Sequence, residues 1–300
     1  MIPNIAQFHL PGLFEFYDFY ERFLPIFYDH REYFYEWVNI ASLYGAPYDC
    51  IWGGGRFGSY DNNTRKVLEL ISKYEISARL TFSNSLLRKE HLLDKKCNKI
   101  CNLFNTTSKV KNGIIIYSDL LLNYIKENYK EFYFVSSTTK VLIDFNDFLD
   151  EINNPDFSYV VADFRLNKEF EKLGALTYEQ KNKVEFLCNE CCYIGCNDRH
   201  ACYENVSQRI LGEENIEHIC KAPFGNEGYK FSRAMESPAF ISVEDIKNKY
   251  VPLGFTNFKI EGRGLGTAVL LEFLLYYLVK TEHQLKIREM MYLDSMLDIL

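Results

Sequence analysis

The cysteines are the residues of this sequence with the clearest capacity for chemistry. Six of the nine lie within 33 residues, in the stretch from Cys188 to Cys196 followed by Cys202 and Cys220. Thiolates are soft ligands that hold iron–sulfur clusters or zinc. Zinc sites commonly use two cysteine pairs at two-residue spacing, and the stretch offers Cys188-x-x-Cys191 without a second pair. The spacing favours an iron–sulfur cluster over zinc, and a group of buried reduced thiols is the alternative.

Carboxylates and histidines supply candidates for proton transfer. Asp163, Glu190 and Glu261 each follow a predicted strand, and a pair of them could act as acid and base. For Glu261 the alternative is a structural ion pair with a neighbouring basic residue. His9 and His200 could carry protons or bind a ligand, or could be hydrogen-bonded structural histidines.

Arginines make up a third candidate set, for binding an anionic group. The guanidinium binds carboxylate and phosphate in bidentate fashion. Each arginine alone is compatible with a surface ion pair. Their shared placement beyond strand ends or in the cysteine stretch predicts a cationic rim of Arg56, Arg165, Arg199 and Arg263.

A glycine run after a short apolar segment permits a nucleotide-binding interpretation. Gly53, Gly55 and Gly58 satisfy the G-x-G-x-x-G pattern. The acidic residue that binds a ribose after the next strand is missing, because Ser83 and Asn84 stand there. We therefore expect a tight turn that lets Arg56 and the backbone approach a ligand.

These residues need elements to position them, and short apolar runs recur with helical stretches between them. Helical character is expected at Phe14–Tyr44, Asp119–Tyr129, Leu166–Leu173 and 265–279. The predicted strands are Ile5–Leu10, Tyr48–Trp52, Ile76–Phe82, Gly113–Tyr117, Phe132–Ser136, Ser158–Ala162, Val184–Leu187 and Phe255–Ile260. Eight strands with helices between them predict a single (β/α)8 barrel over residues 1–300, with a cysteine-rich insertion at 188–254 after strand seven. Chemistry in such barrels collects at the carboxyl ends of the strands.

Composition excludes several classes of protein. The 300 residues are 47% hydrophobic and 25% charged, which is typical of a globular chain. The net charge of −7 disfavours DNA and anionic lipid as partners. The apolar segment Ala268–Val279 is too short to span a bilayer, and Met1–Ile5 does not resemble a secretory signal. We therefore expect a cytoplasmic protein with reduced thiols and no membrane partner.

Several motifs resemble the peptidase U-32 family, the collagenase-like group that includes ubiquinone-hydroxylation and RNA-hydroxylation proteins. Phe258–Arg263 is similar to the Lys-Ile-Glu-Gly-Arg signature after the last strand of that family. Tyr48–Gly54 resembles its second-strand motif with paired glycines. Ser118–Leu120, Ser136–Thr138 and Gly195–Cys196 add similarities in the same order along the chain. The chain thus resembles a divergent member of this group.

The resemblance implies a barrel fold with a four-iron cluster on the seventh loop. Cys192 and Cys196 match the first two cluster ligands, although the family spaces them more widely. The family has its last ligand shortly before the eighth strand, where this chain has Phe240 and Ile241. Cys202 and Cys220 would complete the set, with Cys188 and Cys191 in reserve.

The resemblance also implies oxygen-independent hydroxylation, or a related modification, of an RNA base or a small aromatic metabolite. Arg56, Arg199 and Arg263 would then hold an anionic group, and Glu261 or Asp163 would move protons. One alternative is a peptidase-like hydrolase that uses the strand-end carboxylates, with zinc or no metal. Another is a non-catalytic subunit that pairs with a related barrel.

Overall fold

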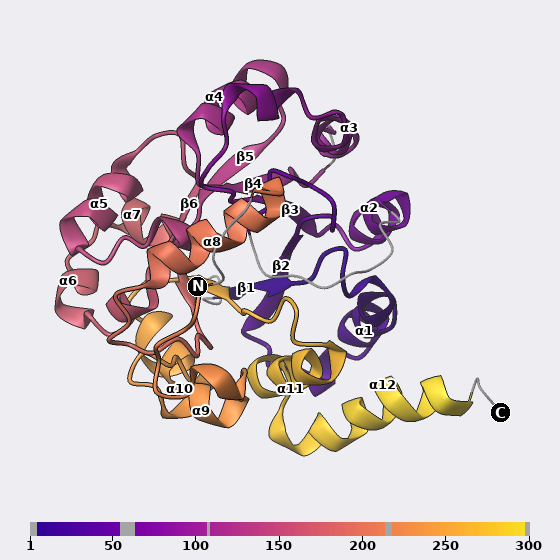
Figure 1. Ribbon diagram of the computed structural model, residues 1–300. Coiled ribbons are helices and arrows are strands. Elements are labelled where there is room, and N and C mark those ends of the chain that lie inside the picture. Colours follow the sequence, from indigo (N-terminus) through magenta and orange to yellow (C-terminus); the bar gives the residue numbers. More distant parts are fainter. Residues whose placement is uncertain (1–4, 55–63, 107–108, 214–217, 298–300) are drawn as a thin grey trace.

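Eight parallel strands form a closed barrel in chain order, β1 to β8 (Figure 1). The computed structural model describes residues 5–54, 64–106, 109–213 and 218–297. The strands are β1 (Ala6–Pro11), β2 (Val38–Gly45), β3 (Ser77–Phe82), β4 (Gly113–Ile116), β5 (Tyr133–Ser136), β6 (Tyr159–Val161), β7 (Val184–Leu187) and β8 (Asn257–Lys259). The predicted (β/α)8 barrel is confirmed.

Helices surround the strands and continue beyond them. The α-helices are α1 (Tyr17–Asp29), α2 (Thr64–Lys73), α3 (Lys95–Phe104), α4 (Asp119–Asn128), α5 (Phe145–Asn153), α6 (Phe170–Gly174), α7 (Tyr178–Lys183), α8 (Arg199–Leu211), α9 (Phe231–Glu236), α10 (Val243–Asp245), α11 (Thr267–Leu278) and α12 (Gln284–Leu297). Short helical turns are η1 (Arg31–Tyr33), η2 (Lys89–Leu93), η3 (Thr138–Lys140), η4 (Phe164–Leu166), η5 (Gly225–Glu227), η6 (Ile246–Tyr250) and η7 (Thr281–His283). In the described part of the chain, every helix is too short or too polar to cross a bilayer.

Successive side chains of a strand alternate between the barrel interior and the layer between the barrel and its helices. On β3, Ala78, Leu80 and Phe82 pack in the apolar layer between barrel and helices. Arg79 and Thr81, on the opposite face of the same strand, are also buried, inside the barrel. Because successive side chains of a strand point to opposite faces, polar residues at alternate positions line the interior of this barrel.

The second strand lies earlier in the chain than predicted. Residues Val38–Gly45 form β2 and pair in parallel with β1 and β3. The predicted helix over Phe14–Tyr44 therefore ends at Asp29, with α1. The predicted strand Tyr48–Trp52 is a turn, in which the Cys50 N–H bonds the Pro47 carbonyl at 3.2 Å. The sequence pattern does not separate β2 from the preceding helix, because β2 follows that helix after a short break and mixes apolar with small polar residues.

In the described part of the glycine run, Gly54 allows two backbone segments to pack closely. A side chain at Gly54 would come within 2.3 Å of the Ser83 backbone. The Asn84 N–H bonds the Trp52 carbonyl at 3.1 Å, so this loop lies directly against the end of β3. Gly55, Arg56 and Gly58 lie outside the described residues.

The long connection from β7 to β8 covers the carboxyl end of the barrel. In Figure 1, α8 crosses the centre of the ring of strands. Ser207 of α8 accepts a hydrogen bond from the Ser85 N–H beyond β3 at 3.1 Å. At the other end of the helix, His200 lies 3.2 Å from the Tyr117 hydroxyl beyond β4. The cysteines at 188–202 thus belong to a segment that lies over the barrel mouth.

Candidate functional site

The ends of β7 and β8 are joined by one asparagine, and this brings two of the predicted acids together. The Asn189 Oδ1 accepts a hydrogen bond from the Glu261 N–H at 2.8 Å, and its Nδ2 donates to the Glu261 carbonyl at 3.1 Å. Tyr229 donates its hydroxyl to the Asn189 carbonyl at 3.0 Å. The backbone positions of Glu190 and Glu261 are therefore fixed relative to each other.

Glu190 is held as a carboxylate by an arginine. The Arg199 Nη2 lies 2.6 Å from Glu190 Oε2, and the Cys192 N–H donates to Glu190 Oε1 at 2.9 Å. Burial raises the pKa of Glu190, but the Arg199 guanidinium and the hydrogen bond from the Cys192 N–H together lower it below its usual range. The guanidinium also lies 4.8 Å from the Phe164 ring centre. Arg199, predicted to bind substrate, is 5% exposed and holds Glu190 in place.

Asp163 joins the same group from the end of β6. Its Oδ1 accepts from the Arg165 N–H at 3.1 Å and from Arg165 Nη1 at 2.9 Å. Its Oδ2 is buried, without a hydrogen-bond partner among the described residues, and lies 3.9 Å from Arg199 Nε. The predicted acids Asp163 and Glu190 therefore contact the same arginine.

Arg165, predicted to bind substrate, fastens the cysteine loop. Its Nε donates to the Ile194 carbonyl at 3.1 Å, and its Nη2 donates to the Cys196 carbonyl at 2.6 Å. A guanidinium that is bound on three sides positions the loop over Asp163. Arg263 is half-buried, 5.9 Å from the Tyr44 ring centre, and its Nη1 is buried without a hydrogen-bond partner in the described structure. The Arg263 guanidinium is thus the better candidate for binding an anion.

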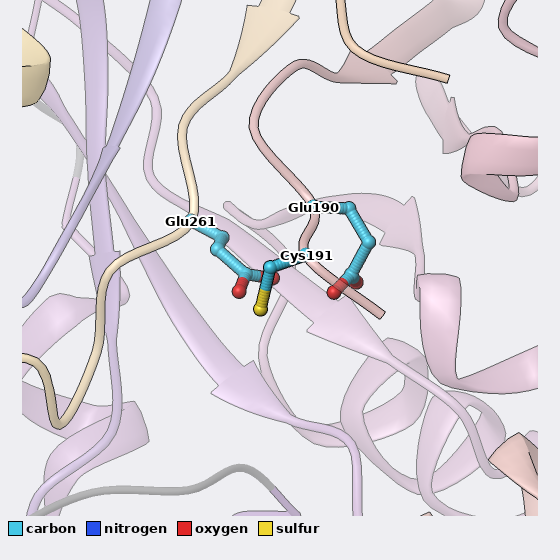
Figure 2. A group of neighbouring side chains, drawn as sticks. All are labelled: Glu190, Cys191 and Glu261. Carbon is cyan, nitrogen blue, oxygen red and sulfur yellow. The ribbon is translucent and has the colours of Figure 1, made fainter. Parts of the chain in front are cut away.

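Glu190, Cys191 and Glu261 form a group that could hold a metal ion. Among the residues that the structure describes, these three each place one ligand atom within 4.8 Å of the other two. Figure 2 shows the two carboxylates and the thiol gathered in one place, from the loops that follow β7 and β8. Glu190 is buried, whereas Cys191 and Glu261 are half-buried.

The thiols predicted to bind the cluster lie around the first turn of α8. Burial raises the pKa of Cys192 to about 12, and proximity to the Cys196 thiol contributes to the rise. The Cys202 N–H bonds the Asp198 carbonyl at 2.9 Å, and Lys221 pairs with Asp198 at 3.2 Å. This ion pair brings the segment that carries Cys220 to the same turn. Cys192, Cys196 and Cys202 are half-buried and Cys220 is exposed, and thiolates are the donor type of a cluster. Among the described residues, no three of these four thiols lie within 4.8 Å of one another. Cys188, a reserve ligand, is fully buried in the apolar core.

Sequence reasoning missed a buried charged group inside the barrel. Glu185 of β7 forms an ion pair with Arg79 of β3, and Lys259 Nζ lies 3.3 Å from Glu185 Oε1. Burial lowers the pKa of Lys259 to about 8. Tyr133 accepts from Arg79 Nε at 2.9 Å. The charged residues Arg79 and Glu185 within apolar strands are visible in the sequence. Only the closed barrel shows that their side chains meet.

His9, a possible proton carrier, belongs to this interior group. Its Nδ1 lies 2.8 Å from Ser42 Oγ, and its Nε2 lies 3.5 Å from Glu185 Oε2. Burial, with Arg79 nearby, lowers the pKa of His9 to about 3. The ring is therefore neutral in the folded protein at physiological pH. His200 lies on the exposed side of α8, 3.5 Å from Glu204.

Comparison with solved structures supports the barrel architecture. The fold is similar to "The Structure of the U32 Peptidase Mk0906", with a TM-score of 0.54 over 88% of this chain and 94% of that chain. Only 10% of the aligned residues are identical, so the likeness is one of fold. No family model and no curated protein matches the sequence. The predicted resemblance to the U-32 family is confirmed at the level of the fold.

Proposed function

We propose that this chain is an iron–sulfur-dependent enzyme that acts at the mouth of its barrel. Its reaction would be oxygen-independent hydroxylation, or a related modification, of an RNA base or a small aromatic metabolite in the reducing cytoplasm. The observation that carries the proposal is that Cys192 lies beside the carboxylate of Glu190 and near the Cys196 thiol, in the loop over the mouth. Zinc is the alternative metal for the same thiols.

Four thiols would hold the cluster, namely Cys192, Cys196, Cys202 and Cys220. When bound, such a cluster supplies electron transfer to or from a substrate at the mouth. Arg165 binds the Cys196 carbonyl and Asp163 together, so the loop keeps a defined distance from the strand ends. The protein thereby places a redox centre close to groups that can exchange protons.

The three acids have different roles in this proposal. Glu190 is kept ionised by Arg199 and accepts hydrogen bonds from a bound substrate. Glu261 is the most exposed of the three and is the group we assign to proton transfer at its carboxylate oxygen. Asp163 is fully buried and keeps Arg165 and Arg199 aligned.

A cationic rim completes the site for an anionic substrate group. Arg263, with its buried Nη1, is the described member that we assign to this role. Arg56 is assigned to the same rim on sequence grounds.

The cluster is tested by metal and spectroscopic analysis of the full chain. Protein purified without oxygen should be brown and hold about four irons and four sulfides per chain. The variant Cys192→Ala/Cys196→Ala should lose iron and colour. The control Cys101→Ala, altered in a thiol buried on α3, should retain both. A colourless, iron-free wild-type protein from cells with active cluster assembly would contradict the proposal.

The substrate class is tested by comparing cells with and without the gene. Mass spectrometry of digested RNA should show one nucleoside that lacks an added oxygen atom in the deletion strain. Restoration by the wild type, but not by Glu261→Gln, would assign the reaction to the barrel mouth. If RNA is unchanged and a hydroxylated aromatic metabolite is lost, the small-molecule alternative holds.

A peptidase-like hydrolase is the second candidate. The fold likeness to a chain described as a U32 peptidase, together with carboxylates at three strand ends, favours it. In this case Glu190 or Glu261 would activate water for attack on an amide. Cleavage of peptide libraries by iron-free protein, lost in Glu261→Gln, would select this function over the first.

A further inference from the structure

We propose that Glu190, Cys191 and Glu261 bind a single zinc ion at a site separate from the thiols assigned to the cluster. Each residue supplies one ligand, namely a carboxylate oxygen, a thiolate sulfur and a second carboxylate oxygen. The proposal does not depend on an iron–sulfur cluster, because it uses none of the four thiols assigned to one.

The geometry of the group is close to that of a bound zinc ion. The three ligand atoms lie within 4.8 Å of one another, and Figure 2 shows them gathered between the ends of two strands. Ligands at roughly 2.0–2.3 Å from zinc in a tetrahedral site lie roughly 3.3–3.8 Å apart. Side-chain rotations that move the ligand atoms by about 1 Å therefore bring all three to bonding distance from one zinc ion.

The backbone that carries the ligands is already fixed. Asn189 makes two hydrogen bonds to the backbone of Glu261, at 2.8 and 3.1 Å, so the two loops cannot separate without breaking both. Arg199 and the Cys192 N–H orient the two oxygens of Glu190. Outer partners of this kind orient metal ligands and raise metal affinity.

Charge gives an independent reason for a cation here. A carboxylate oxygen of Glu190 and one of Glu261 lie within 4.8 Å of each other. Two carboxylates this close repel each other, and a metal cation between them offsets that repulsion. The Cys191 thiol beside them is a donor that magnesium and calcium do not prefer, whereas zinc accepts both sulfur and oxygen. The mixed donor set therefore selects zinc over the hard cations.

The assignment separates two consecutive cysteines. Cys191 belongs to the zinc site with the strand-end acids, and Cys192 belongs with Cys196 in the loop. Three protein ligands leave a fourth zinc position for water or substrate, which is the arrangement of catalytic zinc sites. Since Glu261 and Cys191 are half-buried, that position lies on the side of the barrel mouth.

Cobalt titration tests the site, because cobalt replaces zinc and reports thiolate ligation by its near-ultraviolet charge-transfer absorption. The starting protein is the full-length variant Cys192→Ser/Cys196→Ser, prepared metal-free and reduced, in which two thiols of the other site are absent. We expect one equivalent of Co²⁺ to bind with a band of single-thiolate intensity, and Zn²⁺ to displace it. Adding Cys191→Ser should abolish the band, and adding Glu261→Gln should weaken binding at least about tenfold.

Matched controls decide between the outcomes. Adding Cys202→Ser to the same protein should leave band and affinity unchanged. Circular dichroism checks that each variant folds, and if the Cys191→Ser variant does not, Glu261→Gln decides. No cobalt binding, a band that survives Cys191→Ser, or unchanged affinity in Glu261→Gln would overturn the proposal. The iron content of the wild type, measured separately, decides the cluster, so the two proposals fail independently.

Discussion

The interior of the barrel and its mouth contain the same kinds of charged side chains, but the two groups differ in their exposure to solvent. Inside, Glu185 lies between Arg79 and Lys259, and these three side chains are 0%, 1% and 5% exposed. At the mouth, Glu190 is paired with Arg199 but faces Glu261, which is half-buried. The interior group is closed on every side, and the mouth group borders solvent.

This difference separates a structural role from a chemical one. A buried ion pair costs desolvation energy and stabilises a fold only when all its partners are present. The interior group meets this condition, because Glu185 contacts Arg79, Lys259 and His9. The mouth group brings carboxylates from two strand ends beside a thiol, and two of its members, Cys191 and Glu261, are half-buried. We therefore assign the chemistry to the mouth and the specificity of barrel packing to the interior.

The largest expected effect is on stability, from breaking the interior group. The substitution Glu185→Gln leaves Arg79 and Lys259 buried without their carboxylate, and it should lower the free energy of unfolding by about 3–5 kcal/mol. The matched change at the mouth, Glu261→Gln, should lower it by less than about 1 kcal/mol, since that side chain is half-buried. Urea unfolding at pH 7 measures both. Equal losses would remove the distinction between the two regions.

The second effect is a pH dependence of stability that originates in the interior, at His9. His9 has a pKa of about 3 in the folded protein, against an ordinary value of 6.5. Between these values the unfolded chain binds a proton on His9 and the folded chain does not. Stability should therefore fall as the pH drops from 6.5 towards 3, with His9 contributing up to about 1.4 kcal/mol per pH unit.

Urea unfolding at pH 7, 6 and 5 measures this slope. The variant His9→Gln should have a shallower slope than the wild type. Parallel curves for the wild type and His9→Gln would show that His9 has the same pKa in the folded and unfolded chains, which would contradict the prediction.

The third effect is local and concerns the mouth. Arg165→Ala removes the hydrogen bonds to the carbonyls of Ile194 and Cys196, and it should cost about 1–3 kcal/mol of stability. Hydrogen exchange should accelerate over residues 191–198 and remain unchanged on the strands. Arg22→Ala, at an exposed position on α1, is the control and should alter neither region. Unchanged exchange at 191–198 would show that other contacts hold the loop.

The sequence predicts the barrel because buried strands are apolar, and short apolar runs recur along the chain with helical stretches between them. Seven of the eight strands fall at or near their predicted positions, and the long cysteine-rich connection lies between β7 and β8 as expected. The second strand was missed because the residues of β2 mix small, polar and apolar types. Local pattern alone does not distinguish such a strand from the end of a helix.

The sequence predicts which acidic residues lie at the mouth, but it does not predict which side chains contact each other. Positions after strand ends identified Asp163, Glu190 and Glu261, because parallel strands bring their carboxyl ends to one face. Arg79 and Glu185 are 106 residues apart and meet only when the barrel closes. Cys191 and Cys192 are adjacent in sequence, and only the backbone direction after β7 shows that Cys191 lies with Glu261.

The smallest expected effect is a difference in alkylation rate between the cysteines of the core and those near the mouth. It requires no substitution and does not alter stability. Reduced, metal-free protein treated with iodoacetamide should be alkylated first at the exposed Cys220 and later at half-buried positions of the loop. Protected thiols should be those buried in the core, namely Cys50, Cys97, Cys101 and Cys188. Burial raises the pKa of Cys101 and Cys188 well above the ordinary value, and the thiolate is the reactive form.

Peptide mapping by mass spectrometry gives the order of alkylation, and denaturation in urea should label all nine cysteines. Zinc added at one equivalent should slow Cys191 and leave Cys220 unchanged, whereas an intact cluster should protect Cys220 together with Cys192. Labelling of native Cys188 as fast as Cys220 would show that the end of β7 opens to solvent. In that case the apolar layer outside β7 would open beside the mouth, and the contrast between a closed barrel and an open mouth would not hold at this strand.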